Sequence, residues 1–250
     1  MRVGPLRVGE IPRLVAIVDR PTPPADLLAL QTRGVRVIEF RLDAFPGGGA
    51  EALSWLSTVA GNAELRRQFA LLGTLRDQEP FAHVRLPDFE RLVHLVDLID
   101  VEYEAGREKH AIVQCAQRVG CRTLLSSHDF HRTPPEADMQ AVFDDGAKLG
   151  VDMVKLAVMA ESAIEVRRLL ALTERNASRK GPLPVSIAMG PAGMISRVIA
   201  PLFGSTLTYG YLDQPNAPAQ LSVDEIHNEL LRFFPDYRAD FEQHLAAPRC

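Results

Sequence analysis

The chain has 250 residues, of which 46% are hydrophobic and 24% charged, a composition typical of globular proteins. Its 28 basic and 32 acidic residues give a net charge of −4, so no overall basic field exists to bind nucleic acid or an anionic membrane. Three cysteines are too few, and odd in number, for a disulfide framework. The beginning lacks a signal peptide, and no run reaches the roughly 18 apolar residues of a membrane span. We expect a cytoplasmic protein.

Short apolar runs alternate with amphipathic stretches along the chain. The runs predict eight strands, over residues 14–18, 35–40, 69–74, 98–102, 123–126, 153–158, 184–189 and 206–210. The amphipathic stretches predict helices over 25–33, 50–60, 90–95, 108–119, 136–149, 162–175, 193–202 and 223–233. The last helix begins at a capping box, formed by Ser222 and Glu225.

Eight strands, each followed by a helix, indicate an α/β fold of the (β/α)8 type, a TIM barrel. The alternative is an open doubly wound sheet, which usually carries a Gly-x-Gly-x-x-Gly motif after its first strand. Here the first strand is followed by Asp19-Arg20-Pro21-Thr22, which disfavours a nucleotide-binding fold. We expect residues 1–250 to form a single barrel domain, with an N-terminal hairpin over 1–13 and a C-terminal tail over 235–250.

Charged side chains occupy one face of several predicted strands. Because strand side chains alternate between faces, Ile38 and Phe40 would pack on the helices while Glu39 and Arg41 point into the barrel. The same reasoning selects further polar residues near the C-terminal strand ends: Asp43, Thr74, Arg76, Asp100, Glu102, His128 and Lys155. Burying unpaired charges is costly, and barrel active sites lie at this end of the strands. The pattern therefore predicts a functional site there.

Lys155 stands out because apolar residues flank it on both sides, from Val154 to Val158. Poor solvation and nearby arginines both favour a neutral amine, which can attack a ketone or aldehyde and form a Schiff base. The alternative is a structural lysine paired with Glu39, Asp43 or Asp100.

His128 follows the fifth predicted strand and can move a proton near neutral pH. A Schiff-base lysine with a histidine base suits removal of a proton next to a carbonyl. A metal centre is the competing interpretation, because His128, Asp129 and His131, with Asp100 and Glu102, could ligate a divalent ion. The spacing is common by chance and the basic neighbours repel cations, so we favour the Schiff base.

Eight motifs follow one another along the barrel. They occupy residues 39–43, 73–76, 100–102, 127–130, 154–159, 189–190, 193–197 and 203–205. Their types and order, across roughly residues 14 to 221, resemble type I 3-dehydroquinate dehydratases, also called type I 3-dehydroquinases. The resemblance implies a lyase of the shikimate pathway, used in aromatic amino acid biosynthesis. It implies a homodimer that takes the small molecule 3-dehydroquinate and needs no metal or organic cofactor.

The resemblance also implies roles for individual residues. Lys155 matches the lysine that forms an imine with the C3 ketone of the substrate. His128 matches the base that removes a C2 proton and helps the C1 hydroxyl leave, giving 3-dehydroshikimate. Arg197 matches the arginine that holds the substrate carboxylate. Six further residues match substrate-binding positions: Glu39, Arg41, Arg76, Asp100, Met189 and Gln220.

Two segments depart from the family pattern. After Arg76 the family has a glutamate followed by two glycines, whereas residues 77–81 read Asp-Gln-Glu-Pro-Phe, with Glu79 as the candidate partner of His128. The closing loop Ser-Ala-Pro-Gly-Gln is replaced by residues 216–220, in which Asn216 can still hydrogen-bond the substrate. Ala219 there loses the freedom of glycine at positive φ.

These departures leave three alternatives open beside the dehydratase. One is a slower or substrate-shifted relative, and another is a different class I aldolase-type barrel. The third is a binding or regulatory homologue that retains the fold. Intact Lys155, His128 and Arg197 favour the dehydratase.

Overall fold

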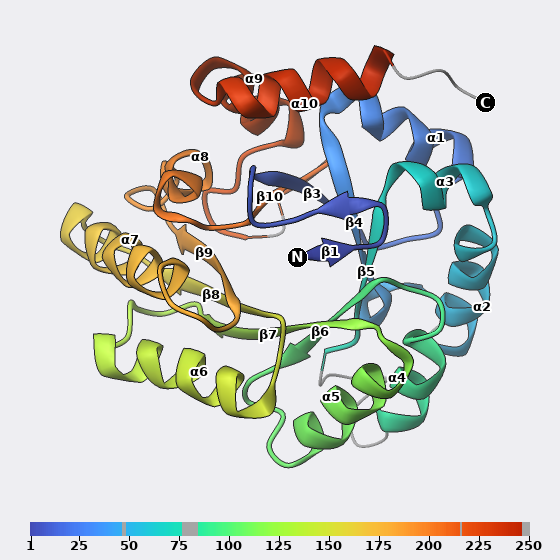
Figure 1. Cartoon of the computed structure of the whole chain (residues 1–250), viewed down its shortest axis with the longest axis horizontal. Coiled ribbons are helices and arrows are strands. Elements are labelled where there is room, and N and C mark those ends of the chain that lie inside the picture. The colour runs from blue at the N-terminus through green and yellow to red at the C-terminus, as the bar shows by residue number, and fades with distance from the viewer. Residues whose placement is uncertain (47–48, 77–84, 216, 247–250) are drawn as a thin grey trace.

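Eight parallel strands surround the centre of the molecule (Figure 1). A computed structural model describes residues 1–46, 49–76, 85–215 and 217–246 of the chain. The strands are β3 (Arg13–Val18), β4 (Val35–Arg41), β5 (Ala70–Thr74), β6 (Leu98–Glu102), β7 (Arg122–Asp129), β8 (Met153–Met159), β9 (Leu183–Met189) and β10 (Leu207–Gly210). Each pairs with its successor from β3 to β9, and β10 pairs with β3. The predicted (β/α)8 barrel is confirmed.

The barrel closes between β9 and β10 without a regular ladder. Pro184 on β9 has no N–H to donate, which limits backbone pairing at this seam. Instead, the backbone N–H of Thr206 donates to the carbonyl oxygen of Pro184 at 2.9 Å. The backbone N–H of Ser186 donates to the hydroxyl oxygen of Ser205 at 3.0 Å. These bonds join the two strands and complete the ring.

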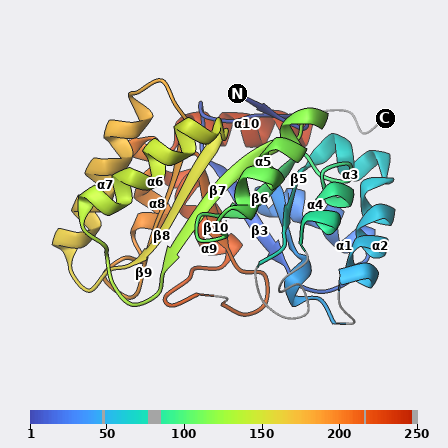
Figure 2. The same cartoon turned by 90° about the horizontal axis from the view of Figure 1, so that it is seen from below.

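Helices surround the barrel on its outside (Figure 2). The α-helices are α1 (Pro24–Ala29), α2 (Gly49–Ala60), α3 (Ala63–Gln68), α4 (Leu86–Leu92), α5 (Glu108–Val119), α6 (Glu136–Leu149), α7 (Ala163–Ala177), α8 (Ser196–Ile199), α9 (Val223–Phe233) and α10 (Pro235–Ala246). Three short 3-10 helices are η1 (Leu30–Arg33), η2 (Leu42–Ala44) and η3 (Ala200–Phe203). None of these described helices is long and apolar enough to cross a membrane.

Local sequence signals explain where several helices begin and end. Gly120 and Gly150 end α5 and α6 in the left-handed conformation, which glycine adopts without a steric penalty. The predicted capping box of α9 is present, with the Ser222 hydroxyl accepting from the backbone N–H of Glu225. Pro201 lies in the first turn of η3, so the helix predicted over 193–202 is divided into α8 and η3.

Two helices differ from the sequence interpretation because their start signals lie outside the apolar pattern. Helix α3 is not predicted, and it begins where the Asn62 side chain accepts from the backbone N–H groups of Glu64 and Leu65. Helix α4 begins at Leu86 rather than residue 90, because Pro87 suits the first helical turn. Pro235 starts α10, which is the helical form of the C-terminal tail expected over residues 235–250.

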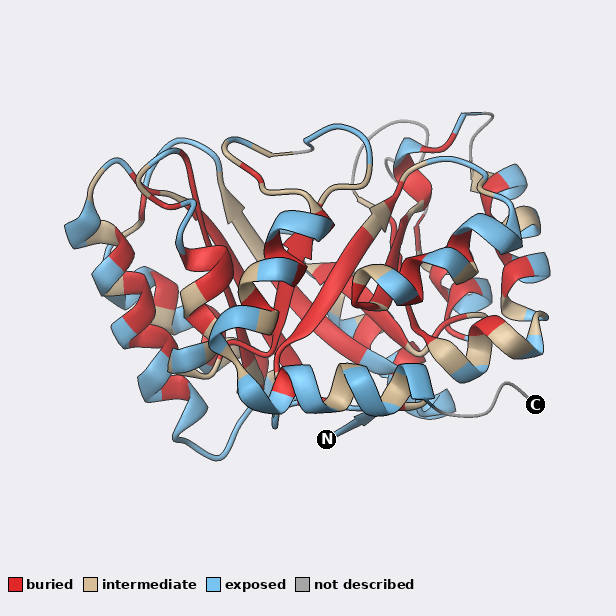
Figure 3. Ribbon diagram, turned by 90° about the horizontal axis from the view of Figure 1, so that it is seen from above, coloured by how far each residue is buried: buried red, intermediate tan, exposed pale blue. Residues whose placement is uncertain are grey.

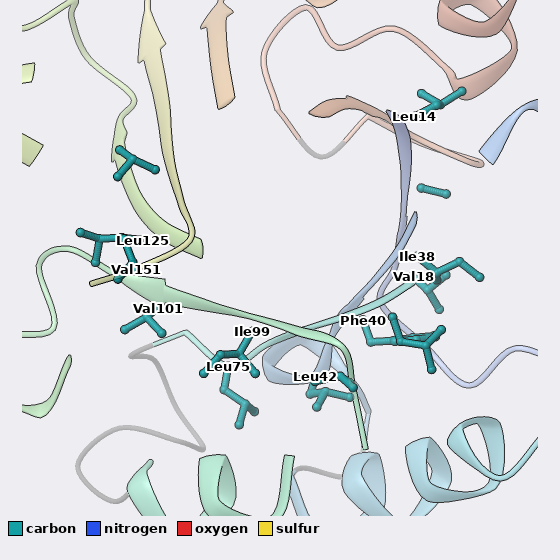
Figure 4. Close-up of a cluster of buried hydrophobic side chains, with 14 of the residues drawn as sticks. Leu14, Val18, Ile38, Phe40, Leu42, Leu75, Ile99, Val101, Leu125 and Val151 are labelled. Atoms are coloured by element: carbon teal, nitrogen blue, oxygen red, sulfur yellow. The ribbon is translucent and has the colours of Figure 1, made fainter. Parts of the chain in front are cut away.

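The core forms two layers, one inside the barrel and one between the barrel and the helices (Figure 3). Ile38 and Phe40 belong to the outer layer, as alternation along the strand predicts (Figure 4). Trp55 of α2 packs edge-on against Phe40, with ring centroids 5.5 Å apart. Residues of the inner layer face one another across the barrel: Val15, Val37, Leu72, Leu98, Leu124, Met153 and Val185. This inner layer leaves room for polar side chains only near the strand ends.

A short antiparallel hairpin covers the N-terminal end of the barrel. Strands β1 (Arg2–Val3) and β2 (Leu6–Arg7) pair with each other, and Figure 1 shows them lying across the middle of the ring. Val3, Leu6 and Val8 are buried and belong to the same cluster as the barrel interior. The hairpin confirms the sequence prediction, and its buried side chains cover this end of the barrel interior.

Candidate active site

A small cavity of about 80 Å³ lies at the C-terminal ends of the strands, opposite the hairpin. Figure 3 shows these strand ends on the side away from the two chain termini. Eight of the residues selected from the sequence line the cavity: Glu39, Arg41, Arg76, His128, Lys155, Met189, Arg197 and Gln220. Asp100 lies beside it, in contact with Lys155. Glu79 and Asn216 lie outside the residues that the structure describes.

Lys155 forms a buried ion pair with Asp100. Its Nζ donates to Oδ2 of Asp100 at 3.0 Å, and the two residues are only 4% and 3% exposed. Burial alone would raise the pKa of Asp100, but Lys155, His128 and a hydrogen bond from Ser126 together hold this pKa below its usual value. The site therefore holds the lysine–carboxylate pair that the sequence analysis gave as the alternative to an unpaired amine. The reason is that inward positions of β6 and β8 meet inside the barrel.

His128 is the base candidate, and its environment keeps the imidazole neutral. Burial lowers the pKa of His128 well below its ordinary value of 6.5, and the charges of Lys155 and Arg76 lower it further. The Arg76 guanidinium, which can only donate, places Nη2 3.0 Å from Nε2 of His128. Nε2 therefore accepts, and the ring proton is assigned to Nδ1. The arrangement gives the site a neutral nitrogen base.

Arg197 presents an open edge to the cavity. Its Nη1 donates to the backbone oxygen of Tyr209 at 3.2 Å, which fixes one side of the guanidinium. Its Nε and Nη2 are buried and have no hydrogen-bond partner among the described residues. Burial lowers the pKa of Arg197 to about 10, so the group is still a cation at neutral pH. Two parallel N–H groups on a buried cation match the two oxygens of a carboxylate.

The two charged side chains of β4 that line the cavity, Glu39 and Arg41, are held in place by hydrogen bonds to other residues of the protein. Arg41 donates from Nε and Nη2 to the Asp43 carboxylate, at 3.0 and 2.6 Å. Desolvation opposes the cation, but the bond to Asp43 and the nearby carboxylates outweigh it and raise the pKa of Arg41. The Thr74 hydroxyl donates to Oε1 of Glu39 at 2.6 Å. These bonds hold both charged side chains in place before any ligand binds.

Gln220 reaches the cavity through a tight turn. The backbone N–H of Gln220 donates to the carbonyl oxygen of Ala217 at 3.3 Å, with Pro218 and Ala219 between them. Ala219 has φ of 52°, the one positive φ of a non-glycine residue in the described chain. Glycine is usual at this turn position, so the alanine carries the strain expected from the sequence.

The alternative metal ligands are not brought together. Among the described residues, no three His, Cys, Asp or Glu side chains are grouped so that they could hold a metal ion. Asp129 accepts from the backbone N–H groups of His131 and Arg132, at 2.9 and 3.0 Å. Asp100 is bound to Lys155 instead.

The comparison with protein families assigns the chain to one of them. The model described as Type I 3-dehydroquinase matches residues 22–234. The chain belongs to this family. It is 31% identical over 238 residues to the 3-dehydroquinate dehydratase of Methanococcoides burtonii, which covers 90% of this chain and 96% of the relative. It is 32% identical over 209 residues to the 3-dehydroquinate dehydratase of Klebsiella pneumoniae (strain 342). That alignment covers 77% of this chain and 80% of the relative.

Solved structures show the same fold for this type I 3-dehydroquinase family member. The crystal structure of 3-dehydroquinate dehydratase from Geobacillus kaustophilus superposes with a TM-score of 0.82 at 23% identity. That alignment covers 94% of this chain and 97% of the other. The likeness extends over the barrel and its surrounding helices.

Several cavity residues were not selected from the sequence. Tyr209 lines the cavity from β10, and Ile187 does so from β9. Ser126 of β7, also not selected, donates to Oδ1 of Asp100. The alternation used for β4 and β8 also places Leu207 and Tyr209 on the inner face of β10, so applying it to that strand would have found the tyrosine.

Proposed function

We propose that this family member dehydrates 3-dehydroquinate to 3-dehydroshikimate through a Schiff base on Lys155. One observation carries the proposal: the Lys155 amine, the His128 imidazole and the open edge of Arg197 line a single cavity. An amine, a neutral base and a carboxylate receptor are the groups that this reaction requires. Family membership supports the substrate, and the similar proteins named above are called 3-dehydroquinate dehydratases.

Imine formation begins at the Lys155–Asp100 pair. The ammonium first gives up a proton, and the neutral imidazole of His128 on the same cavity wall can take it. The amine then attacks the C3 carbonyl carbon, and the resulting carbinol hydroxyl takes the proton back from His128 and leaves as water. Asp100, buried and negatively charged, stabilises the positive charge of the iminium that remains.

Elimination follows at the neighbouring carbons. His128 removes a proton from C2, and the electron pair moves into the iminium, which acts as the electron sink. The C1 hydroxyl then leaves with the proton that His128 carries, so one water is released. Hydrolysis of the imine consumes the water released earlier and frees Lys155 and the enone. The overall reaction is loss of a single water from the substrate.

The remaining residues bind and orient the substrate. Arg197 holds the carboxylate with Nε and Nη2, its unpartnered atoms. Glu39, Arg41 and Arg76 bind the ring hydroxyls, and their existing hydrogen bonds reduce the entropy lost on binding. Met189 and Gln220 contribute the opposite wall and the closing turn. Glu79 and Asn216 remain candidates on the basis of the resemblance alone.

The assembly and location follow from the same family resemblance. The enzyme acts in the cytoplasm as a homodimer, without a metal or organic cofactor. Light scattering coupled to gel filtration checks the dimer, which requires twice the 27.6 kDa of one chain. A single-chain mass would contradict it.

Turnover of 3-dehydroquinate tests the activity. We expect conjugated-enone absorbance to appear with the wild-type chain and to be lost in Lys155→Met. Lys148→Met is a matched control, because Lys148 is exposed on α6, where it donates to Asp145 at 2.9 Å. Full activity after treatment with a chelator is expected too, whereas loss that zinc or magnesium restores would support the metal alternative. A wild-type chain that gives no enone would contradict the proposal.

A further inference from the structure

One polar group in the cavity has no part in this mechanism, namely the hydroxyl of Tyr209. Tyr209 lies on β10, is 3% exposed, and lines the cavity together with Lys155 and Arg197. Nζ of Lys155 lies 4.6 Å from the centroid of its ring, a cation–π contact that fixes the ring beside the amine. The phenol therefore extends from β10 toward the reacting centre.

The Tyr209 hydroxyl has no hydrogen-bond partner among the described residues. Six buried side-chain atoms of the described chain share this state, and three of them belong to Arg197 and Tyr209 in this cavity. Nearly all buried polar groups in proteins are hydrogen-bonded, and leaving one unpaired destabilises the fold. Arg197 and Tyr209 line the same cavity, and both have buried polar atoms without a hydrogen-bond partner among the described residues. One ligand in the cavity can therefore bind both.

The hydroxyl is held in its protonated, donating form. Burial raises the pKa of Tyr209 well above its usual value, and the charges of Glu39 and Asp100 raise it further. The nearby acceptors already have donors: Thr74 binds Glu39, while Ser126 and Lys155 bind Asp100. An O–H donor beside these groups is free to serve a ligand oxygen.

The geometry points to Tyr209 as a further substrate-binding residue, whose hydroxyl donates to an oxygen of the bound polyhydroxylated keto acid near the carbon that Lys155 attacks. This inference rests on the proposed function and adds a specificity determinant to it. A site with a buried donor discriminates against ligands that lack the matching oxygen, because binding them leaves the donor unpaired. The same donor makes the free protein less stable than it would be without the hydroxyl.

The test is Tyr209→Phe, which removes only the hydroxyl and retains the ring beside Lys155. We expect kcat/KM for 3-dehydroquinate to fall roughly three- to tenfold, mainly through a higher KM, as for loss of one neutral hydrogen bond. The thermal midpoint of the free variant should equal or exceed that of the wild type. Tyr211→Phe, two residues along the chain and outside the cavity, is the matched control and should stay within about twofold of the wild-type kcat/KM.

The outcomes separate this inference from the proposed function. An active wild type with unchanged kinetics in Tyr209→Phe would overturn the role of Tyr209 while leaving the dehydratase intact. A lower midpoint of the free variant, again with unchanged kinetics, would make the hydroxyl structural and also overturn it. A wild type that does not turn over 3-dehydroquinate would contradict the proposed function and, with it, this inference.

Discussion

Nη2 of Arg76 lies 3.0 Å from Nε2 of His128, so a cation donates to the nitrogen that is to act as the base. Together with burial and the charge of Lys155, this contact disfavours a proton on the imidazole, and it identifies Nε2 as the nitrogen without a hydrogen. Arg76 follows β5 and His128 lies on β7, so the contact bridges the mouth of the barrel across β6.

Stability should fall as the pH drops below 6.5, partly because of His128. The unfolded chain binds a proton on this residue at its ordinary pKa of 6.5, whereas the lowered pKa leaves the folded site unprotonated. The loss begins near pH 6.5 and grows down to the lowered pKa. Between pH 7.5 and 5.5, the wild type should lose about 1 kcal/mol more of its unfolding free energy than His128→Asn. Denaturant titrations at both pH values measure this, and parallel losses in the two proteins would contradict it.

Lys155→Met should destabilise the fold by about 3 kcal/mol, because it leaves the Asp100 carboxylate buried without its ion-pair partner. Adding Asp100→Asn should restore part of the lost stability by removing that charge. Activity should not return in the double variant, since the amine is still missing. Unfolding free energies and enone formation are measured on all three proteins. A single variant as stable as the wild type would show that the pair is not formed in solution.

Arg197→Lys should weaken substrate binding without abolishing chemistry. An ammonium keeps the charge but lacks the two parallel N–H groups that match a carboxylate, so KM should rise roughly 10- to 100-fold with a smaller change in kcat. Steady-state kinetics provide the measurement. Arg175→Lys on α7 is the control, because Arg175 is 40% exposed at its side chain and pairs with Glu136 on the surface. Equal KM values in wild type and Arg197→Lys would place the carboxylate elsewhere.

Ala219→Gly should stabilise the protein, although most glycine substitutions do the opposite. Ala219 has φ of 52°, which costs alanine about 1 kcal/mol and glycine nothing. Greater freedom of glycine in the unfolded chain offsets part of this gain. Ala217→Gly in the same turn, where φ is not positive, is the control and should lower stability. Thermal unfolding compares them, and a lower midpoint for Ala219→Gly would show that the turn is not strained.

The fold could be predicted because buried strands and amphipathic helices each have a local hydrophobicity pattern, and the two patterns alternate along the chain. Inward placement of Glu39 and Lys155 followed from a two-residue period and from burial on both faces of a parallel strand. Helix α3 was not predicted, since it depends on a start signal at Asn62 rather than on apolar periodicity.

The contacts between side chains inside the site could not be predicted from the sequence. The sequence leaves Glu39, Asp43 and Asp100 as possible partners of Lys155, and only the packing of β6 and β8 on either side of β7 selects Asp100. The contact between Arg76 and His128 joins side chains at the ends of β5 and β7, two strands that are not neighbours in the sheet. Tyr209 could have been found from the inward face of β10, the shortest of the barrel strands, but its contact with Lys155 could not. Such relationships arise from barrel geometry, which local patterns do not encode.

Reductive trapping tests the covalent step itself. The protein is incubated with 3-dehydroquinate and borohydride, digested, and the modified peptide is identified by mass spectrometry. The account predicts an adduct with the mass of the reduced imine on Lys155 and inactivation that requires both reagents. An adduct on a different lysine, or full enone production with no adduct and no inactivation, would contradict it.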